Sequence, residues 1–143
     1  MREILFRGRS VEHNMWVGGD LTVVDGKPFI LMFKRIDDGG QLRFKAFEVV
    51  PETVGQWTGS RDKNGVKIFE GDIIRCPKYY HSYEVMFRDG CFCTRWYCET
   101  FEHDVYEALY DNEREKRFET ELYAEVVGNI YETPELLEET RSS

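Results

Sequence analysis

The sequence predicts a mainly β protein, in which an N-terminal antiparallel meander precedes a small SH3-like barrel with one or two short helices. Apolar and polar residues alternate over short segments, which is the period of a β-strand. Turn dipeptides such as Asp25-Gly26 and Asn64-Gly65 punctuate these segments, at the spacing typical of all-β folds. Hydrophobic residues make up 41% of the 143 residues, which is enough for a core without cross-links.

The first 50 residues predict the meander. After a short opening strand, residues 15–24 form a second strand, and Asp25-Gly26 is typical of a type I′ hairpin turn. The segment 29–33 is apolar on both faces, so we expect a central strand that is buried on both sides. Residues 42–49 alternate regularly between apolar and polar side chains, which predicts a half-buried strand.

Pro51 marks a boundary, because proline cannot donate a ladder hydrogen bond and restricts the residue before it. We therefore predict an N-terminal β subdomain over residues 1–50 and an SH3-like barrel over residues 51–143. About five short strands build this barrel, and a hairpin turns at Asp89-Gly90. Proline at the first position of residues 134–139 indicates a final turn of helix.

The region 99–125 is an acidic insertion in the second subdomain. It carries 10 Asp and Glu against 3 Lys and Arg, whereas residues 1–98 carry 13 acidic and 15 basic residues. Within it, residues 104–118 place apolar side chains at helical spacing with Asp104 as N-cap, so they predict a short helix. A disordered or extended loop fits the same residues. Such a stretch is typical of a solvated face, and it also suits a basic partner.

The expected location is the cytoplasm. No apolar run reaches the roughly 18 residues of a membrane helix, and the first residues lack the apolar core of a signal peptide. We therefore expect no membrane contact, and we expect the four cysteines to stay reduced.

Three segments resemble the YopX family of phage and prophage proteins. They are MREILFR at 1–7, the stretch 50–74 with VPETVGQWTG, DKNG and IFEGDII, and VGNIYETPELL at 127–137. Trp57 and Phe69 stand where the family pattern is expected to have Tyr, and Ser60 where it is expected to have Leu. The resemblance implies a bacterial, phage or prophage setting and a small, mainly β fold. It implies no catalytic residues, and it places no family-wide activity in residues 77–125.

Two constellations suggest chemistry, and each has a structural alternative that we favour. Glu70 and Asp72 share a strand face, so they could form a carboxylate pair; alternatively Gly71 permits a bend and Asp72 hydrogen-bonds within its own turn. Thiols and imidazoles also gather in the second half, but their spacing does not match a zinc site, and free cysteines are common buried hydrophobes. We predict no metal and no cofactor. These thiols and imidazoles belong to Cys76, His81, Cys91, Cys93, Cys98 and His103.

One set of candidate binding residues consists of Trp57, Arg61 and Lys63. An aromatic ring with nearby cations is typical of small barrels that bind single-stranded nucleic acid by stacking bases and contacting phosphates. The alternative is a core tryptophan with a charged loop around it. A nucleic-acid-binding small β-barrel is therefore our second functional hypothesis.

The other set consists of Tyr79, Tyr80 and Trp96, which lie in an aromatic-rich part of the second subdomain. Aromatic residues are enriched at interface cores; the alternative is cross-strand packing inside the barrel. The first hypothesis is therefore a non-enzymatic accessory module that binds a host or phage protein. The acidic stretch could mimic nucleic acid in that role, and a homo-oligomer would cover exposed aromatics.

Overall fold

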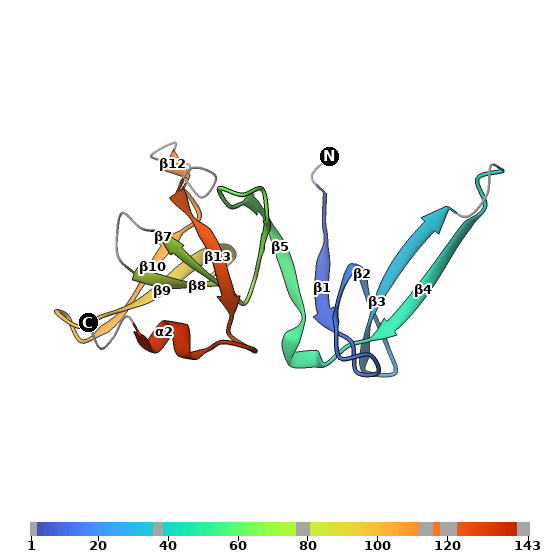
Figure 1. The fold of residues 1–143 in the computed structure, drawn as a ribbon, viewed down its shortest axis with the longest axis horizontal. Helices are drawn as coiled ribbons and strands as arrows, with labels where there is room; N and C mark the ends of the chain where they lie inside the picture. Colours follow the sequence, from blue (N-terminus) through green and yellow to red (C-terminus); the bar gives the residue numbers. More distant parts are fainter. Residues whose placement is uncertain (1–2, 36–38, 77–80, 112–115, 118–122, 140–143) are drawn as a thin grey trace. The chain divides into compact units, whose positions relative to one another are not determined.

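The computed structural model describes residues 3–35, 39–76, 81–111, 116–117 and 123–139. The chain divides into two compact units, Met1–Trp57 and Thr58–Ser143, whereas the sequence analysis placed the boundary near residue 50. Both units are built from antiparallel strands (Figure 1). The predicted mainly β class is confirmed. No helix among the described residues is long and apolar enough to cross a membrane.

In the N-terminal unit β1 to β4 form a meander, and β5 returns to pair with β1, which gives the spatial order β4-β3-β2-β1-β5. The turn between β2 and β3 has positive φ at both Asp25 (51°) and Gly26 (78°), which confirms the predicted type I′ turn. Val17, Ile30 and Val49 form the core of this unit. The elements are β1 (Phe6–Arg9), β2 (Trp16–Val24), β3 (Lys27–Arg35), β4 (Leu42–Glu48), the short 3-10 helix η1 (Pro51–Thr53) and β5 (Gly55–Arg61).

The prediction that residues 29–33 are buried on both faces is wrong for their second half. Ile30 is fully buried, but Met32 and Phe33 are 43% and 48% exposed. The prediction of a half-buried strand over 42–49 is also wrong for its first half, where Leu42 and Phe44 are each 60% exposed.

The path of β2 explains both errors, because its residues Trp16–Gly19 pair with β1 and not with β3. β2 pairs with β3 from Lys27 to Leu31, whereas β4 pairs with β3 as far as Arg35. Residues 32–35 and 42–45 therefore continue as a two-stranded β-ribbon that no third strand of the described residues flanks (Figure 1). We call these eight residues the ribbon.

The C-terminal unit contains a five-stranded sheet in the order β10-β9-β8-β7-β13. Its core gathers Ile68, Ile74, Val85 and Leu109. Among the described residues no pairing joins β10 to β13, so this sheet is not closed into a barrel. The elements are β6 (Lys67–Phe69), β7 (Asp72–Cys76), β8 (His81–Arg88), β9 (Cys91–Cys98), β10 (His103–Ala108), β11 (Tyr110–Asp111), β12 (Lys116–Arg117), β13 (Glu125–Asn129) and α2 (Glu135–Glu139).

The predicted helix over 104–118 is wrong for the residues that the structure describes, since Tyr110–Asp111 and Lys116–Arg117 also pair as strands; residues 112–115 and 118 lie outside the described residues. Residues His103–Ala108 form β10, which pairs with β9 at six successive positions. Val105 and Tyr106 are residue types that favour strands, and the neighbouring β9 supplies a partner for every step of the ladder. Asp104 faces Arg95 across the strands instead of capping a helix; its Oδ2 lies 3.5 Å from Nη1 of Arg95.

Candidate functional site

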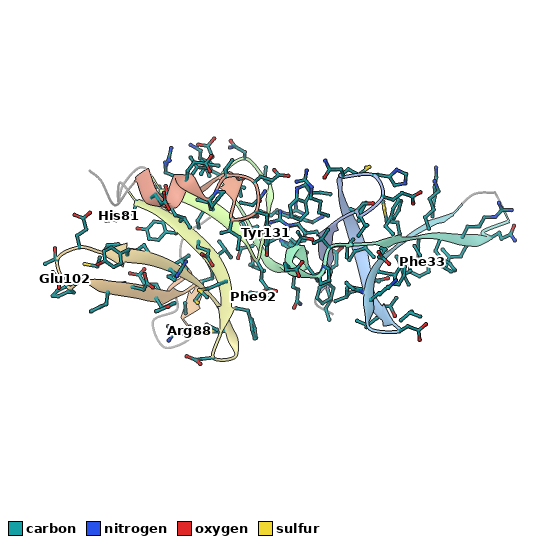
Figure 2. The ribbon with its side chains drawn as sticks, turned by 90° about the horizontal axis from the view of Figure 1, so that it is seen from below. Phe33, His81, Arg88, Phe92, Glu102 and Tyr131 are labelled. Carbon is teal, nitrogen blue, oxygen red and sulfur yellow. The ribbon has the colours of Figure 1, made fainter. Side chains whose placement is uncertain are left out.

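The ribbon has one apolar face. Cross-strand pairing sets Phe33 of β3 opposite Phe44 of β4, with ring centroids 5.7 Å apart. Leu42 lies two residues before Phe44, so it shares this face. We call Phe33, Leu42 and Phe44 the apolar face; Figure 2 marks Phe33 on it. These side chains are 48–60% exposed, and adjacent exposed apolar side chains are typical of contact surfaces.

The opposite side of the ribbon carries three cations beside Met32, which pairs with Lys45. Lys34 of β3 pairs directly with Arg43 of β4, and Lys45 lies two residues further along β4 on the same side. We call Lys34, Arg43 and Lys45 the basic face. All three side chains are exposed. Sequence reasoning missed both faces, although the alternation of Leu42-Arg43-Phe44-Lys45 carried the signal.

Two of the predicted binding residues have partners inside the C-terminal unit. Nη1 of Arg61 donates to the carbonyl oxygen of Gly65 at 3.0 Å. Nζ of Lys63 lies 3.7 Å from Oε2 of Glu125. Trp57 is half-buried in β5 and is the last residue of the N-terminal unit. The structure thus uses the two cations to hold the loop that surrounds Asp62.

The second candidate set is described only in part, since Tyr79 and Tyr80 lie outside the described residues. Trp96 stacks on His81 at a centroid distance of 4.3 Å and meets Tyr83 edge-on at 6.5 Å. It packs against the core cluster of the C-terminal unit. These contacts agree with cross-strand packing, which was the alternative to an exposed contact surface. The binding role of Trp96 stays a prediction.

Asp62 explains why the stretch 50–74 contains the turn residues Asn64 and Gly65. Its Oδ1 accepts hydrogen bonds from the backbone N–H groups of Asn64 (2.8 Å) and Val66 (2.9 Å). Its Oδ2 accepts from the N–H of Val126, 64 residues away, at 3.0 Å. The backbone of Lys63 also donates to the carbonyl of Ala124 at 2.9 Å. One buried carboxylate therefore joins the 62–66 turn to β13.

A second set of contacts joins the bend before β7 to the segment after β13. The N–H of Gly71 donates to the carbonyl of Val85, and the carbonyl of Gly71 accepts from the N–H of Ile130. Oδ1 of Asn129 accepts from the N–H groups of Tyr131 and Glu132. Two segments that are distant in sequence are thus held together by hydrogen bonds to backbone groups.

Glu70 and Asp72 were considered as a carboxylate pair, but Asp72 has the structural role that was the alternative, a hydrogen bond within its own turn. Asp72 is buried, and its Oδ2 accepts a hydrogen bond from the N–H of Phe69 at 2.8 Å. Among the residues that the structure describes, no group of three or more His, Cys, Asp or Glu side chains is placed to hold a metal ion.

A shallow, open depression of about 190 Å³ lies near the β8–β9 turn. Its lining includes Cys91, Cys93 and Tyr106. Arg88, marked in Figure 2, places its guanidinium carbon 3.7 Å from the ring centroid of Tyr106. Burial raises the pKa of the Cys93 thiol. This thiol is therefore neutral at physiological pH, which disfavours a role as a nucleophile.

The thiols differ in burial, which predicts their reactivity. Cys91 is exposed, whereas Cys76, Cys93 and Cys98 are buried, and burial raises the pKa of Cys76 to about 11. In the native protein at pH 8, we expect Cys91 to react with a colorimetric disulfide reagent about tenfold or more faster than the other thiols. Cys91→Ser should remove the fast phase; persistence of that phase in this variant would show that a buried thiol is accessible.

Part of the acidic stretch is neutralised within the sheet. Nη2 of Arg95 lies 2.6 Å from Oε1 of Glu84, and its Nη1 also contacts Asp104. The charge of Asp104 is therefore partly neutralised by Arg95 on the neighbouring strand β9. Mimicry of nucleic acid by residues 99–125 stays a prediction.

Comparison with known proteins identifies a family. A family model described as "YopX protein" matches residues 5–138. Among solved structures, the crystal structure of protein EF1440 from Enterococcus faecalis is similar, with 23% sequence identity and a TM-score of 0.49. This similarity covers 96% of this chain and 99% of that one. No curated protein matches the chain.

Proposed function

The chain belongs to the YopX family, and we propose that it is a non-enzymatic module that binds a protein partner through the apolar face of the ribbon. The observation that carries the proposal is the exposure of Phe33, Leu42 and Phe44 on one side of a two-stranded ribbon. Contiguous exposed apolar side chains mark interaction sites, and aromatic residues are enriched at interface cores.

The polar residues of the segments that resemble the YopX family support a structural role for those segments. Asp62 and Asn129 accept hydrogen bonds from backbone groups within the C-terminal unit, and Asp72 accepts one from Phe69. Carboxylates that are committed in this way are poorly suited to proton transfer, which needs a group within reach of a substrate. A binding role on the ribbon therefore agrees better with these contacts than a catalytic role.

A protein partner agrees better with the surface than nucleic acid does. Arg61 and Lys63, the cations first considered for phosphate contacts, have partners within the fold. The apolar face would remain in water if phosphates alone bound the basic face, and water contact of apolar surface is unfavourable. We place this activity in the cytoplasm of a bacterial host that carries a phage or prophage.

The test is affinity capture of the tagged protein from lysate of such a host, with and without nuclease, read by mass spectrometry. We expect one enriched protein that survives nuclease. We expect the double substitution Phe33→Ser and Phe44→Ser to reduce its recovery at least about tenfold, because hot-spot aromatics each contribute roughly 2 kcal/mol or more.

A matched control replaces two exposed apolar residues outside the ribbon, Val23→Ser with Val24→Ser. Both side chains are more than half exposed on β2. This variant should capture the partner as the unchanged protein does. Equal losses in both variants would contradict a role for the apolar face, and loss of capture on nuclease treatment would favour the nucleic-acid hypothesis.

A further inference from the structure

Strand β4 is the last strand of the N-terminal sheet. One side of it pairs with β3 over seven consecutive positions, from Leu42 to Glu48. In the part of the chain that the structure describes, no named strand pairs with its other side; at the end of β4 the N–H of Val11 donates to the carbonyl of Glu48, so the open edge runs from Leu42 to Phe47. Such an edge presents backbone N–H and C=O groups to which an extended segment can pair. Proline, which would block this pairing, is absent from β4.

Among the described residues, the charges on the basic face have no carboxylate close to them. Lys34 and Arg43 are directly opposite each other, an arrangement that is destabilising for like charges. No carboxylate of the described residues forms an ion pair with Lys34, Arg43 or Lys45. At the other end of the same hairpin, by contrast, Nζ of Lys27 lies 3.8 Å from Oε1 of Glu48.

The alternation of side chains along β4 determines which residue types a strand added beside it should have. Residues that pair directly across two strands point to the same face and bring their Cβ atoms within about 5.5 Å. A strand added to β4 would therefore extend the apolar face opposite Leu42 and Phe44, and would extend the basic face opposite Arg43 and Lys45. A complementary strand therefore has apolar residues opposite Leu42 and Phe44, and carboxylates opposite Arg43 and Lys45.

We infer that β4 binds an extended segment of the partner protein by strand addition, and that this segment alternates apolar and acidic residues. The inference rests on the proposed function and names the chemistry of the partner. Backbone hydrogen bonds would supply affinity, and the alternation of side chains would supply specificity.

A second copy of β4 fits the same edge less well. Antiparallel pairing of two copies with Phe44 opposite Phe44 would match the apolar residues. The same register would set Arg43 of each copy opposite Lys45 of the other, which repeats the like-charge arrangement on both sides. An acidic segment removes that repulsion.

The first test measures binding of fluorescein-labelled peptides by anisotropy at about 50 mM salt, where screening is weak. The probe is VEVEVEV. Its controls are VVEEEVV, which has the same composition without alternation, VKVKVKV, and VEPEPEV, in which proline disrupts strand pairing. We expect the probe to bind at least about tenfold more tightly than each control. Equal binding of VVEEEVV or VEPEPEV would overturn strand addition, and so would absence of binding.

The second test exchanges the charges. The double substitution Arg43→Glu and Lys45→Glu should weaken binding of VEVEVEV at least about tenfold and should create binding of VKVKVKV. Both side chains are exposed, and circular dichroism would confirm that the variant folds. Retained binding of VEVEVEV by this variant would overturn the inference.

Other occupants would give distinct results. Tighter binding of a single-stranded oligonucleotide than of VEVEVEV, abolished by the same charge exchange, would assign the basic face to nucleic acid. A dimer in sedimentation equilibrium that Phe33→Ser with Phe44→Ser dissociates would assign the ribbon to a second copy. Either result overturns the inference. Failure of the peptides alone, with capture still lost in the Phe33→Ser and Phe44→Ser variant, would leave the proposed function standing.

Discussion

Replacing Asp62 with alanine is expected to destabilise the C-terminal unit by about 3 to 5 kcal/mol, since a hydrogen bond to a charged group contributes roughly 1.5 to 3 kcal/mol. Asp62 is only 3% exposed. Its two oxygens accept hydrogen bonds from three backbone N–H groups, those of Asn64, Val66 and Val126. Alanine removes both acceptor oxygens, so all three hydrogen bonds are lost and the 62–66 turn is detached from β13.

Asp62→Asn separates the hydrogen bonds within the 62–66 turn from the one that reaches β13. Its amide oxygen can still accept from Asn64 and Val66, but its NH₂ group cannot accept from Val126. We therefore expect about half of the loss caused by Asp62→Ala. The measurement is denaturant unfolding followed by the fluorescence of Trp96, in a background where Trp16 and Trp57 are replaced by phenylalanine. A loss below about 1 kcal/mol for Asp62→Ala would contradict the structural role of this carboxylate.

Replacing Gly71 with alanine is expected to cost about 2 to 4 kcal/mol, which combines left-handed backbone strain with overpacking. Gly71 has φ of +88°. A Cβ atom there would lie 2.8 Å from Cε2 of Tyr131. Hydrogen bonds from its N–H to Val85 and from Ile130 to its carbonyl hold this backbone in place, so the clash is not relieved by a shift of the bend.

Gly90→Ala is the matched control, because Gly90 has a similar φ of +83° and an added Cβ would meet nothing within 4 Å. It should cost only the backbone strain, about 1 to 2 kcal/mol. In a Tyr131→Ala background the cost of Gly71→Ala should fall to the same value. Equal costs for Gly71→Ala and Gly90→Ala in the unchanged background would show that Tyr131 does not fill the space beside the bend.

The reliable predictions from sequence were local ones. Asp25-Gly26 and Asp89-Gly90 both form tight turns with positive φ, because two adjacent residues suffice to encode the backbone conformation. The hairpin of β8 and β9 and the helical turn α2 follow from equally short patterns. The helix predicted after Asp104 failed because its apolar spacing was compatible with a strand, and pairing with β9 decided between them.

The candidate binding surface could not be predicted in the same way. Phe33 and Phe44 read as core residues, since aromatic residues in alternating strands are usually buried on one face. Their exposure depends on where β2 stops pairing with β3, at Leu31. Conversely, Arg61 and Lys63 read as exposed cations for a ligand, but Gly65 and the distant Glu125 engage them.

The sequence by itself determined the mainly β class, the positions of the tight turns and the family of the chain, because each depends on residues that are close together along it. Only the tertiary structure decided which apolar residues are buried, how Asp62 reaches Val126, and that the ribbon presents one apolar and one basic face. Burial and long-range hydrogen bonding depend on which strands become neighbours in space. That choice rests on contacts between residues far apart in the sequence, which no local pattern records.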